Sequence, residues 1–225
     1  MVSTPERPVA APPAEDAGAR SLLPGEPGYL SEPICIRLPA AWQLTDLAFV
    51  ELSQNNEPWI FETTETGDLL IMVGEGMETS AIGAEFIVDL GMWNRSSGGG
   101  RVMGPSGAAR ATKQLIMIPD VSWVSHERIK EGEQDSEGIL LGICPEFVIE
   151  VRSKSDSLRL QQEKMERWIR YGALLGWLVD PQEETVWIYR PDSDPEQVAK
   201  PVELEGEEVC VGLTVDVARI WELGE

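Results

Sequence analysis

Two carboxylates interrupt apolar runs of the sequence and could do chemistry if the fold brings them together. Asp120 follows Pro119 in LIMIPDVSWVS, and Glu150 lies within PEFVIEVRSK, two residues before Arg152. Side chains two residues apart in a strand point to the same face, so Glu150 and Arg152 should project together, roughly 6.6 Å apart along the chain. The sequence therefore predicts an acid and a base on one face of a buried strand.

A pair of carboxylates in a partly dry pocket suits a divalent metal, because two like charges repel unless a positive charge lies between them. Mg²⁺ prefers oxygen ligands, needs only one or two carboxylates, and leaves positions for water and phosphate. Asp120 and Glu150 would then hold Mg²⁺ or Mn²⁺, and a nearby cation would stabilise the charge that builds at phosphorus. Two carboxylates, a divalent metal and a nearby cation are an arrangement typical of metal-assisted phosphodiester hydrolysis.

Plainer interpretations stay open at this point. Asp120 could be a solvated aspartate at a turn, since Pro-Asp is common there. Glu150 could lie on the exposed face of a half-buried strand, and Arg152 could only form a structural ion pair with it.

The elements that must position these residues follow from apolar periodicity and turn signals. In chain order we expect a helix within 41–54, a hairpin at 59–73, and a helix that Thr79 or Ser80 caps and that the glycines 98–100 end. Strands at 101–104, 115–124 and 146–152 should follow, and then a helix within 153–173 with Asp156 or Ser155 as its N-cap. A strand at 174–181 with a hairpin partner and a short amphipathic piece at 216–221 complete the chain. Such alternation predicts an α/β or α+β fold with a mixed central sheet.

The domain organisation is expected to be simple. Residues 1–30 are rich in Pro, Ala, Gly and charge, which predicts a disordered tail, and residues 31–225 should form a single domain. There is no uncharged apolar run of about 18 residues and no basic segment followed by an apolar one, so we expect neither a membrane span nor a secretory signal. A cytoplasmic protein fits best.

Composition narrows the chemistry further. The three cysteines are widely spaced without a CxxC pair, and a single histidine, His126, excludes a multi-histidine metal centre. The net charge of −21 disfavours nucleic acid at long range. Residues 145–171 are the exception, since they carry six basic and five acidic side chains, whereas 181–208 carry two basic and nine acidic. The neighbourhood of Glu150 is therefore the least acidic part of the chain.

The amino-acid sequence around the two carboxylates resembles that of a known family. The Pro-Asp at 119–120 and the Glu-Val-Arg at 150–152 are similar to the PD-(D/E)xK nuclease pattern. The stretches IPDVSWVS, CPEFVIEVRSKSDSLRLQQEKMERWIRYGALLGWLVDP and VWIYRP, together with WIFETTETGDLLIM and ETSAIGAEFIVDL upstream, resemble the Uma2 family of restriction-endonuclease-like proteins over roughly residues 42–222. The resemblance implies a restriction-endonuclease-like αβββαβ core, with a mixed central sheet flanked by helices and β-hairpin additions, and a metal-dependent endonuclease acting on nucleic acid, with DNA the expected substrate.

Carried onto this chain, the resemblance makes Asp120 and Glu150 the metal ligands. Arg152 stands where the pattern has its lysine, and because arginine stays protonated it can hold phosphate but cannot serve as a general base. Lys164 on the following helix is the candidate for the missing lysine, with Lys154 as the second.

Two further acids are candidates for the same site, and two alternative functions stay open. Glu85 matches a family position that faces the site and could accept a proton from a metal-bound water, and Glu62 in the first hairpin is a further candidate. Cutting of both strands of DNA would favour a homodimer. The alternative function is a non-catalytic nuclease-fold module that binds a protein or nucleic-acid partner, which the absent motif lysine and the acidic charge favour. An enzyme with a similar pocket acting on another phosphodiester, such as RNA or a nucleotide, is the third reading.

Overall fold

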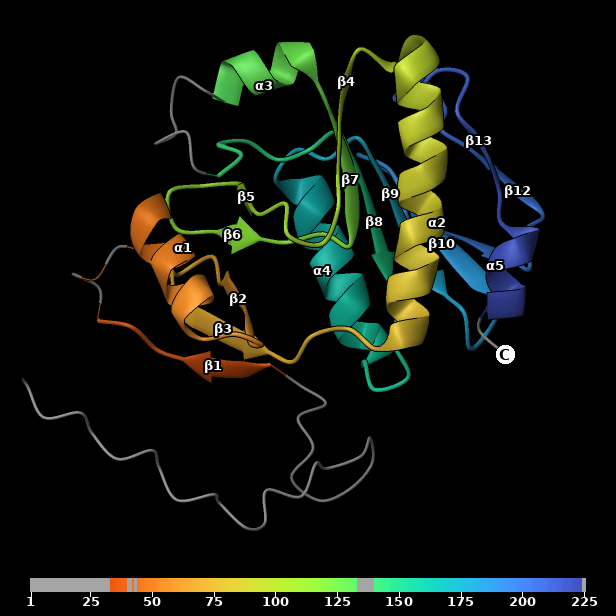
Figure 1. Cartoon of the computed structure of the whole chain (residues 1–225). Helices are drawn as coiled ribbons and strands as arrows, with labels where there is room; N and C mark the ends of the chain where they lie inside the picture. Colours follow the sequence, from red (N-terminus) through yellow and green to blue (C-terminus); the bar gives the residue numbers. More distant parts are fainter. Residues whose placement is uncertain (1–32, 40–41, 43, 133–139, 224–225) are drawn as a thin grey trace, which may run out of the picture.

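A six-stranded mixed sheet forms the centre of the protein in the computed structural model, which describes residues 33–39, 42, 44–132 and 140–223 (Figure 1). The strand order is β11-β10-β9-β8-β7-β4, and only β8 and β9 run parallel. The strands are β4 (Gly100–Met103), β7 (Val121–Ser125), β8 (Phe147–Val151), β9 (Leu175–Asp180), β10 (Thr185–Tyr189) and β11 (Glu196–Ala199). The expected tail at 1–30 lies outside the described residues.

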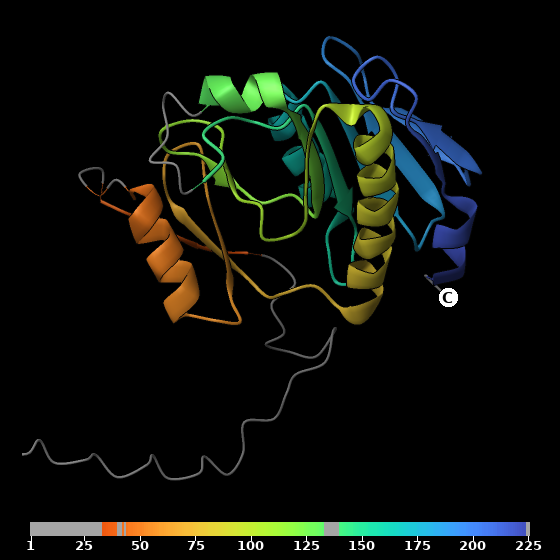
Figure 2. The same ribbon diagram turned by 45° about the horizontal axis from the view of Figure 1, so that its top comes forward.

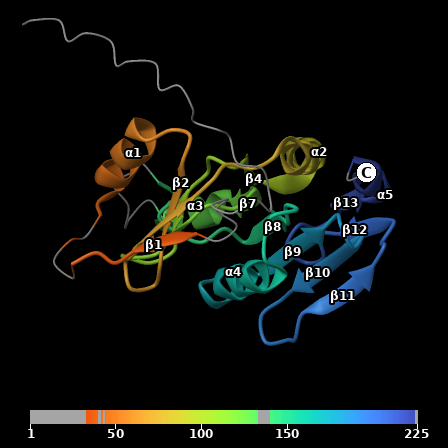
Figure 3. The same cartoon turned by 90° about the horizontal axis from the view of Figure 1, so that it is seen from below.

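Helices cover both faces of this sheet. Figure 3 shows α2 (Met77–Trp93) and α5 (Ala218–Leu223) on one face and α4 (Leu158–Arg170) on the other. The helix α4 is the crossover between β8 and β9, which is why these two strands are parallel. The elements α2, β4, β7, β8, α4 and β9 make up the αβββαβ core, so the predicted fold class is confirmed.

The strand β8 is buried on both faces, and its side chains alternate as the period of two requires. Phe147, Ile149 and Val151 pack in the core beneath α2 and α5, whereas Val148 packs beneath α4. Glu150 is only 2% exposed. The alternative that it lies on a solvated face of the strand is therefore wrong.

A second, three-stranded sheet precedes the core in the chain. It has the order β1-β3-β2, with β1 (Ile34–Ile36), β2 (Ile60–Thr63) and β3 (Leu69–Met72), and β2 and β3 form the predicted hairpin. The helix α1 (Asp46–Asn55) packs Phe49 against this sheet near Phe61 and Leu69. In Figure 2 this unit lies on the opposite side of the molecule from α5.

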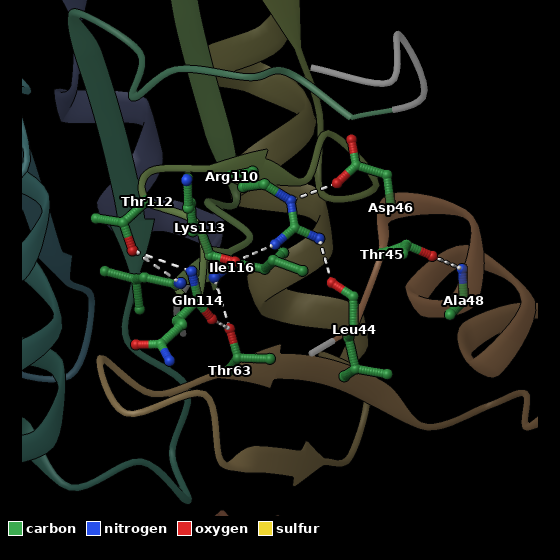
Figure 4. A network of polar contacts seen from close by, with 11 residues as sticks. Leu44, Thr45, Asp46, Ala48, Thr63, Arg110, Thr112, Lys113, Gln114 and Ile116 are labelled. Atoms are coloured by element: carbon green, nitrogen blue, oxygen red, sulfur yellow. Dashed lines mark hydrogen bonds and ion pairs between the residues drawn. The ribbon is translucent and has the colours of Figure 1, made fainter. Parts of the chain in front are cut away.

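A polar network fixes the N-terminal sheet to the rest of the protein (Figure 4). Arg110 donates to Asp46, to the carbonyl of Leu44 at 2.9 Å and to the carbonyl of Lys113 at 2.8 Å. The Thr63 hydroxyl donates to the Gln114 carbonyl and accepts from the amide of Ile116, both at 2.6 Å. Because the chain runs from here into Pro119 and Asp120, the network ties β2 to the start of β7.

The remaining elements are peripheral. They are the π-helix η1 (Asn94–Gly98), the pair β5 (Ala109–Arg110) and β6 (Ile116–Met117), the helix α3 (His126–Gly132), and the pair β12 (Glu203–Glu205) and β13 (Thr214–Asp216). No helix among the described residues is both long enough and apolar enough to cross a membrane.

Two predicted helix starts need correction. The helix α2 begins at Met77, and its N-cap Gly76 lies three or four residues before the predicted caps Thr79 and Ser80. The helix α4 begins after Ser157, because the Asp156 carboxylate accepts the Ser153 amide at 2.9 Å and thereby closes the preceding turn.

Candidate active site

A cavity of about 870 Å³ lies between the N-terminal sheet, the connection from β3 to α2, and the helix α4. Asp120, Glu150 and Lys164 all line it. The strands β7 and β8 pair so that Val121 lies opposite Ile149, which places Asp120 opposite Glu150 at the next position of the ladder. Directly opposed residues of neighbouring strands share a face, so the two predicted acids converge as expected.

The Lys164 ammonium holds three partners at the floor of the cavity. It lies 3.0 and 3.1 Å from the two oxygens of Glu150, 3.0 Å from Glu62, and 2.8 Å from the carbonyl of Ile118. Three acceptor groups match the three hydrogens of an ammonium. Glu62 also accepts the Ile118 amide at 2.9 Å, so β2 and the segment before β7 share this centre.

Glu150 is oriented by a second donor. The indole nitrogen of Trp168, one turn after Lys164 on α4, donates to a Glu150 oxygen at 2.7 Å. Asp120 in turn accepts the amide of Val151 at 2.6 Å. Both carboxylates are thus held by donors from buried elements, which leaves them little rotational freedom.

Glu75 is a site residue that the sequence prediction missed. Its carboxyl group hydrogen-bonds to that of Asp120, and it also lines the cavity. Glu75 sits in VGEGM, between two glycines in the connection from β3 to α2. The only signal in the sequence is this lone acid directly after a hairpin, and loop residues positioned by a rigid scaffold often carry function.

The site carries four acids, Glu62, Glu75, Asp120 and Glu150, around one lysine, and the pKa values of Asp120 and Glu150 are raised there. Burial raises the pKa of Glu150 to about 8; Lys164 opposes that shift, while Asp120 and Glu62 add to it. Burial and the adjacent Glu75 carboxyl raise the pKa of Asp120 well above its usual range. Burial alone would lower the pKa of Lys164, but the surrounding carboxylates raise it above its ordinary value, so the amine stays charged.

The structure places two predicted site residues outside the cavity. Arg152 lies one position past the end of β8, where its guanidinium donates to the Asp180 carboxylate at 2.7 Å and to the Asp156 carbonyl at 3.1 Å. Glu85 pairs with Arg219 of α5 at 3.4 Å. Neither residue lines the cavity with Asp120 and Glu150. We therefore correct both expectations: Arg152 is occupied by a buried aspartate, and Glu85 faces another helix.

The two further candidates both line the cavity, at different depths. Glu62 lies at the floor, 2% exposed, in contact with Lys164. Lys154 is at the rim, where it pairs with Glu78 of α2 at 2.7 Å.

The donor set fits a hard divalent cation held by few protein groups. Carboxylate oxygens are the ligands that Mg²⁺ and Mn²⁺ prefer, and the carboxyl groups of Asp120 and Glu75 lie close enough together to suit a cation. Across the described part of the chain, no three His, Cys, Asp or Glu side chains are arranged to hold a metal ion. Asp120 and Glu150 are the residues that would hold such a cation.

We expect that Asp120→Asn raises the free energy of unfolding of the metal-free protein by about 1 kcal/mol, or roughly 2–4 °C. The asparagine oxygen can still accept the Val151 amide, and its NH₂ group can donate to the Glu75 carboxylate. The pKa of Asp120 is raised in the folded state, so this carboxyl destabilises the folded protein increasingly as the pH rises above the pKa of an aspartate in the unfolded chain. The gain should therefore be larger near pH 8 than near pH 5 in thermal unfolding with EDTA.

Asp180→Asn is the matched control with the opposite sign. Asp180 is 1% exposed and accepts from Arg152, so its neutralisation leaves a guanidinium without its buried partner. Destabilisation by both substitutions at every pH would contradict the expected repulsion between Asp120 and Glu75.

Comparison with known proteins identifies the family. The Uma2 family model, described as "Putative restriction endonuclease", matches residues 47–218. The chain belongs to the Uma2 family. A crystal structure titled as "a putative nuclease belonging to DUF820" from Anabaena variabilis is similar to this Uma2 protein with a TM-score of 0.66, over 81% of this chain and 99% of that chain, at 22% sequence identity. That likeness shows the shared fold. The search of curated proteins finds no match.

Proposed function

We propose that this Uma2 protein is a divalent-metal-dependent nuclease that hydrolyses phosphodiester bonds of nucleic acid, with DNA as the expected substrate. Membership of a family described as restriction-endonuclease-like supports a nuclease. The observation that carries the proposal is the pair Asp120, just before β7, and Glu150, on the adjacent strand β8, which line one cavity beside Lys164.

Asp120 and Glu150 would hold the metal, and Glu75 is a third carboxylate within reach of Asp120. A bound divalent cation would act as a Lewis acid on the phosphate and lower the pKa of a bound water. Glu75 lies on a loop and lines the cavity, and we assign to it the role of accepting the proton of the attacking water.

Lys164 has an electrostatic role in this proposal. Its raised pKa keeps it protonated, so it does not act as a general base. It fixes Glu150 and Glu62 and supplies positive charge next to the scissile phosphate, as the lysine of the PD-(D/E)xK pattern would, although it comes from α4. Trp168 adds orientation by donating to Glu150.

The test is cleavage of labelled DNA and RNA with Mg²⁺ or Mn²⁺, with and without EDTA. We expect cleavage that EDTA stops and that Asp120→Asn lowers by at least about 100-fold, because the metal site supplies several kcal/mol of charge stabilisation. The matched control is Asp89→Asn, an aspartate that pairs with Arg219 away from the cavity. Equal products from the Asp120 and Asp89 variants would refute the proposal.

Calorimetric titration with Mn²⁺ separates the alternative function. A nuclease-fold module without catalysis would show no metal uptake that depends on Asp120 and no cleavage, while still binding a partner. Metal uptake abolished by Asp120→Asn but kept in Asp89→Asn supports the enzyme.

A further inference from the structure

A polar stripe on α4 extends from the candidate active site along the cavity. Gln161, Lys164, Arg167 and Arg170 recur every third residue, and all four line the cavity. An α-helix rises 1.5 Å per residue, so successive members lie about 4.5 Å apart along its axis. Lys164 is occupied by the acids at the floor, so its neighbours on either side are the groups free to contact a substrate beyond the reacting phosphate.

Two atoms of this stripe have unmet hydrogen-bonding capacity. Nε of Arg167 and Oε1 of Gln161 are buried, and neither has a hydrogen-bond partner within the described residues. A buried polar atom left unpaired is costly, so such atoms are rare and call for a ligand or an ordered water. The fork of guanidinium donors matches the geometry of a phosphate. Arg167 is therefore suited to an anion, and Gln161 to a hydrogen-bond donor.

The opposite wall keeps the cavity narrow. Arg170 reaches across from the end of α4 to Glu65 in the β2–β3 turn at 3.1 Å, and Lys154 reaches Glu78 at 2.7 Å at the other end. The side chains of Ile60, Leu70 and Met72 add an apolar surface between these ion pairs. The cavity volume of about 870 Å³ lies within the range of small-ligand pockets.

The acids lie deep in the cavity, which limits the kinds of nucleic acid that can bring a phosphate to them. Glu150 and Glu62 are each 2% exposed, so a phosphate must enter the cavity to reach them. In a duplex the phosphates are tied to stacked base pairs and a second backbone, which opposes the entry of one phosphate to acids at the floor of the cavity. A single strand can unstack its nucleotides and follow a channel lined by basic side chains and apolar surface.

We propose that this cavity takes a single strand of nucleic acid in preference to a duplex, with Arg167 holding the phosphate next to the reacting one and Gln161 hydrogen-bonding to the nucleotide on the other side of Lys164. The inference rests on the proposed function for the position of the reacting phosphate. It adds the substrate class and two positioning residues.

Binding and cleavage are measured separately to test it. Fluorescence anisotropy in Ca²⁺ uses a labelled single-stranded DNA, the RNA of the same sequence, and the DNA duplex, while cleavage is followed in Mg²⁺. We expect both single strands to bind more tightly than the duplex. Comparison of the RNA with the single-stranded DNA shows whether ribose or deoxyribose is preferred. Arg167→Gln should weaken single-strand binding about tenfold and reduce the salt dependence by about 0.7 in slope, the value for one phosphate contact of a single strand.

The matched control is Arg159→Gln. Arg159 is on the same helix and pairs with Glu163, but it does not line the cavity. We expect the affinity of the Arg159 variant for single strands, and the salt dependence of that affinity, to stay as in the unmodified protein. Gln161→Ala, by contrast, should raise KM without changing kcat by more than about twofold.

The outcomes are distinguishable from those of the proposed function. Duplex bound and cut as well as the single strand, no single-strand binding at all, or equal losses in the Arg159 and Arg167 variants would each overturn the inference. Single-strand binding that depends on Arg167, without cleavage of any substrate, would uphold the inference and refute the nuclease.

Discussion

Lys164→Met should lower the free energy of unfolding of the metal-free protein by about 3–5 kcal/mol, which is the usual result of removing one partner from a buried ion pair. Lys164 is the shared partner of Glu150 and Glu62, both 2% exposed, and it also donates to the Ile118 carbonyl. Methionine has a similar length and fills the space, so the loss reports the missing charge rather than a cavity. Urea or thermal unfolding in EDTA measures it.

The loss should depend on pH with a definite sign. The pKa of Glu150 is already raised to about 8, and without the ammonium it rises further, so the folded variant binds a proton that the unfolded chain releases. The stability of the variant therefore falls as the pH rises above the unfolded glutamate pKa, about 4.3. The deficit relative to the unmodified protein should be smaller near pH 5 than near pH 8.

Lys154→Met is the control for this prediction. Lys154 also forms one ion pair beside the cavity, but its side chain is 61% exposed, and exposed pairs contribute about 0–1 kcal/mol. We expect a change within about 0.5 kcal/mol. If both lysine variants lost the same stability, Lys164 would not be the charge that holds the acids.

The pairing of Asp120 with Glu150 was predicted from the motif and the family resemblance, whereas the strand that carries Glu150 was predictable from local pattern. The apolar run around Glu150 defines a strand buried on both faces, and its period of two sets the face of each side chain. Asp120 lies just before β7, which pairs antiparallel with β8. Because Val121 lies opposite Ile149, the preceding residue Asp120 comes to lie next to Glu150. The helix α4, with Lys164, follows from the spacing of Met165 and Trp168.

The errors come from partners that are distant in the sequence. Arg152 continues the face of Glu150, but the parallel neighbour β9 places Asp180 beside it, and the buried aspartate takes the guanidinium. The position of Glu85 on α2 fixes a face of that helix, yet only the packing of α5 shows that this face meets Arg219. Glu75 lies in a loop with no period, so its approach to Asp120 depends on tertiary structure.

Glu150→Gln should lower the cleavage rate of the metal-loaded protein by about 1000-fold or more, which corresponds to about 4 kcal/mol of transition-state stabilisation. The substitution removes one of the two opposed carboxylates but keeps an oxygen that can accept from Trp168 at the same place. Folding should therefore be retained, and thermal unfolding checks it. Single-turnover cleavage at saturating Mg²⁺ measures the rate.

Glu127→Gln is the matched control, since Glu127 is an exposed glutamate in the first turn of α3 that does not line the cavity. Its rate should stay within about twofold of the unmodified protein. A folded Glu150→Gln variant that cuts as fast as the control would show that the reaction does not pass through this carboxylate.

The double variant Asp120→Asn/Glu150→Gln tests whether the two acids act through one ion. Residues that work as a unit are not additive, because losing either already removes what they hold together. We therefore expect the double variant to cut at about the rate of the slower single variant, and its Mn²⁺ uptake to be no weaker than theirs. Losses that multiply would mean two independent contributions, and the carboxylates opposed across β7 and β8 would then not share a metal.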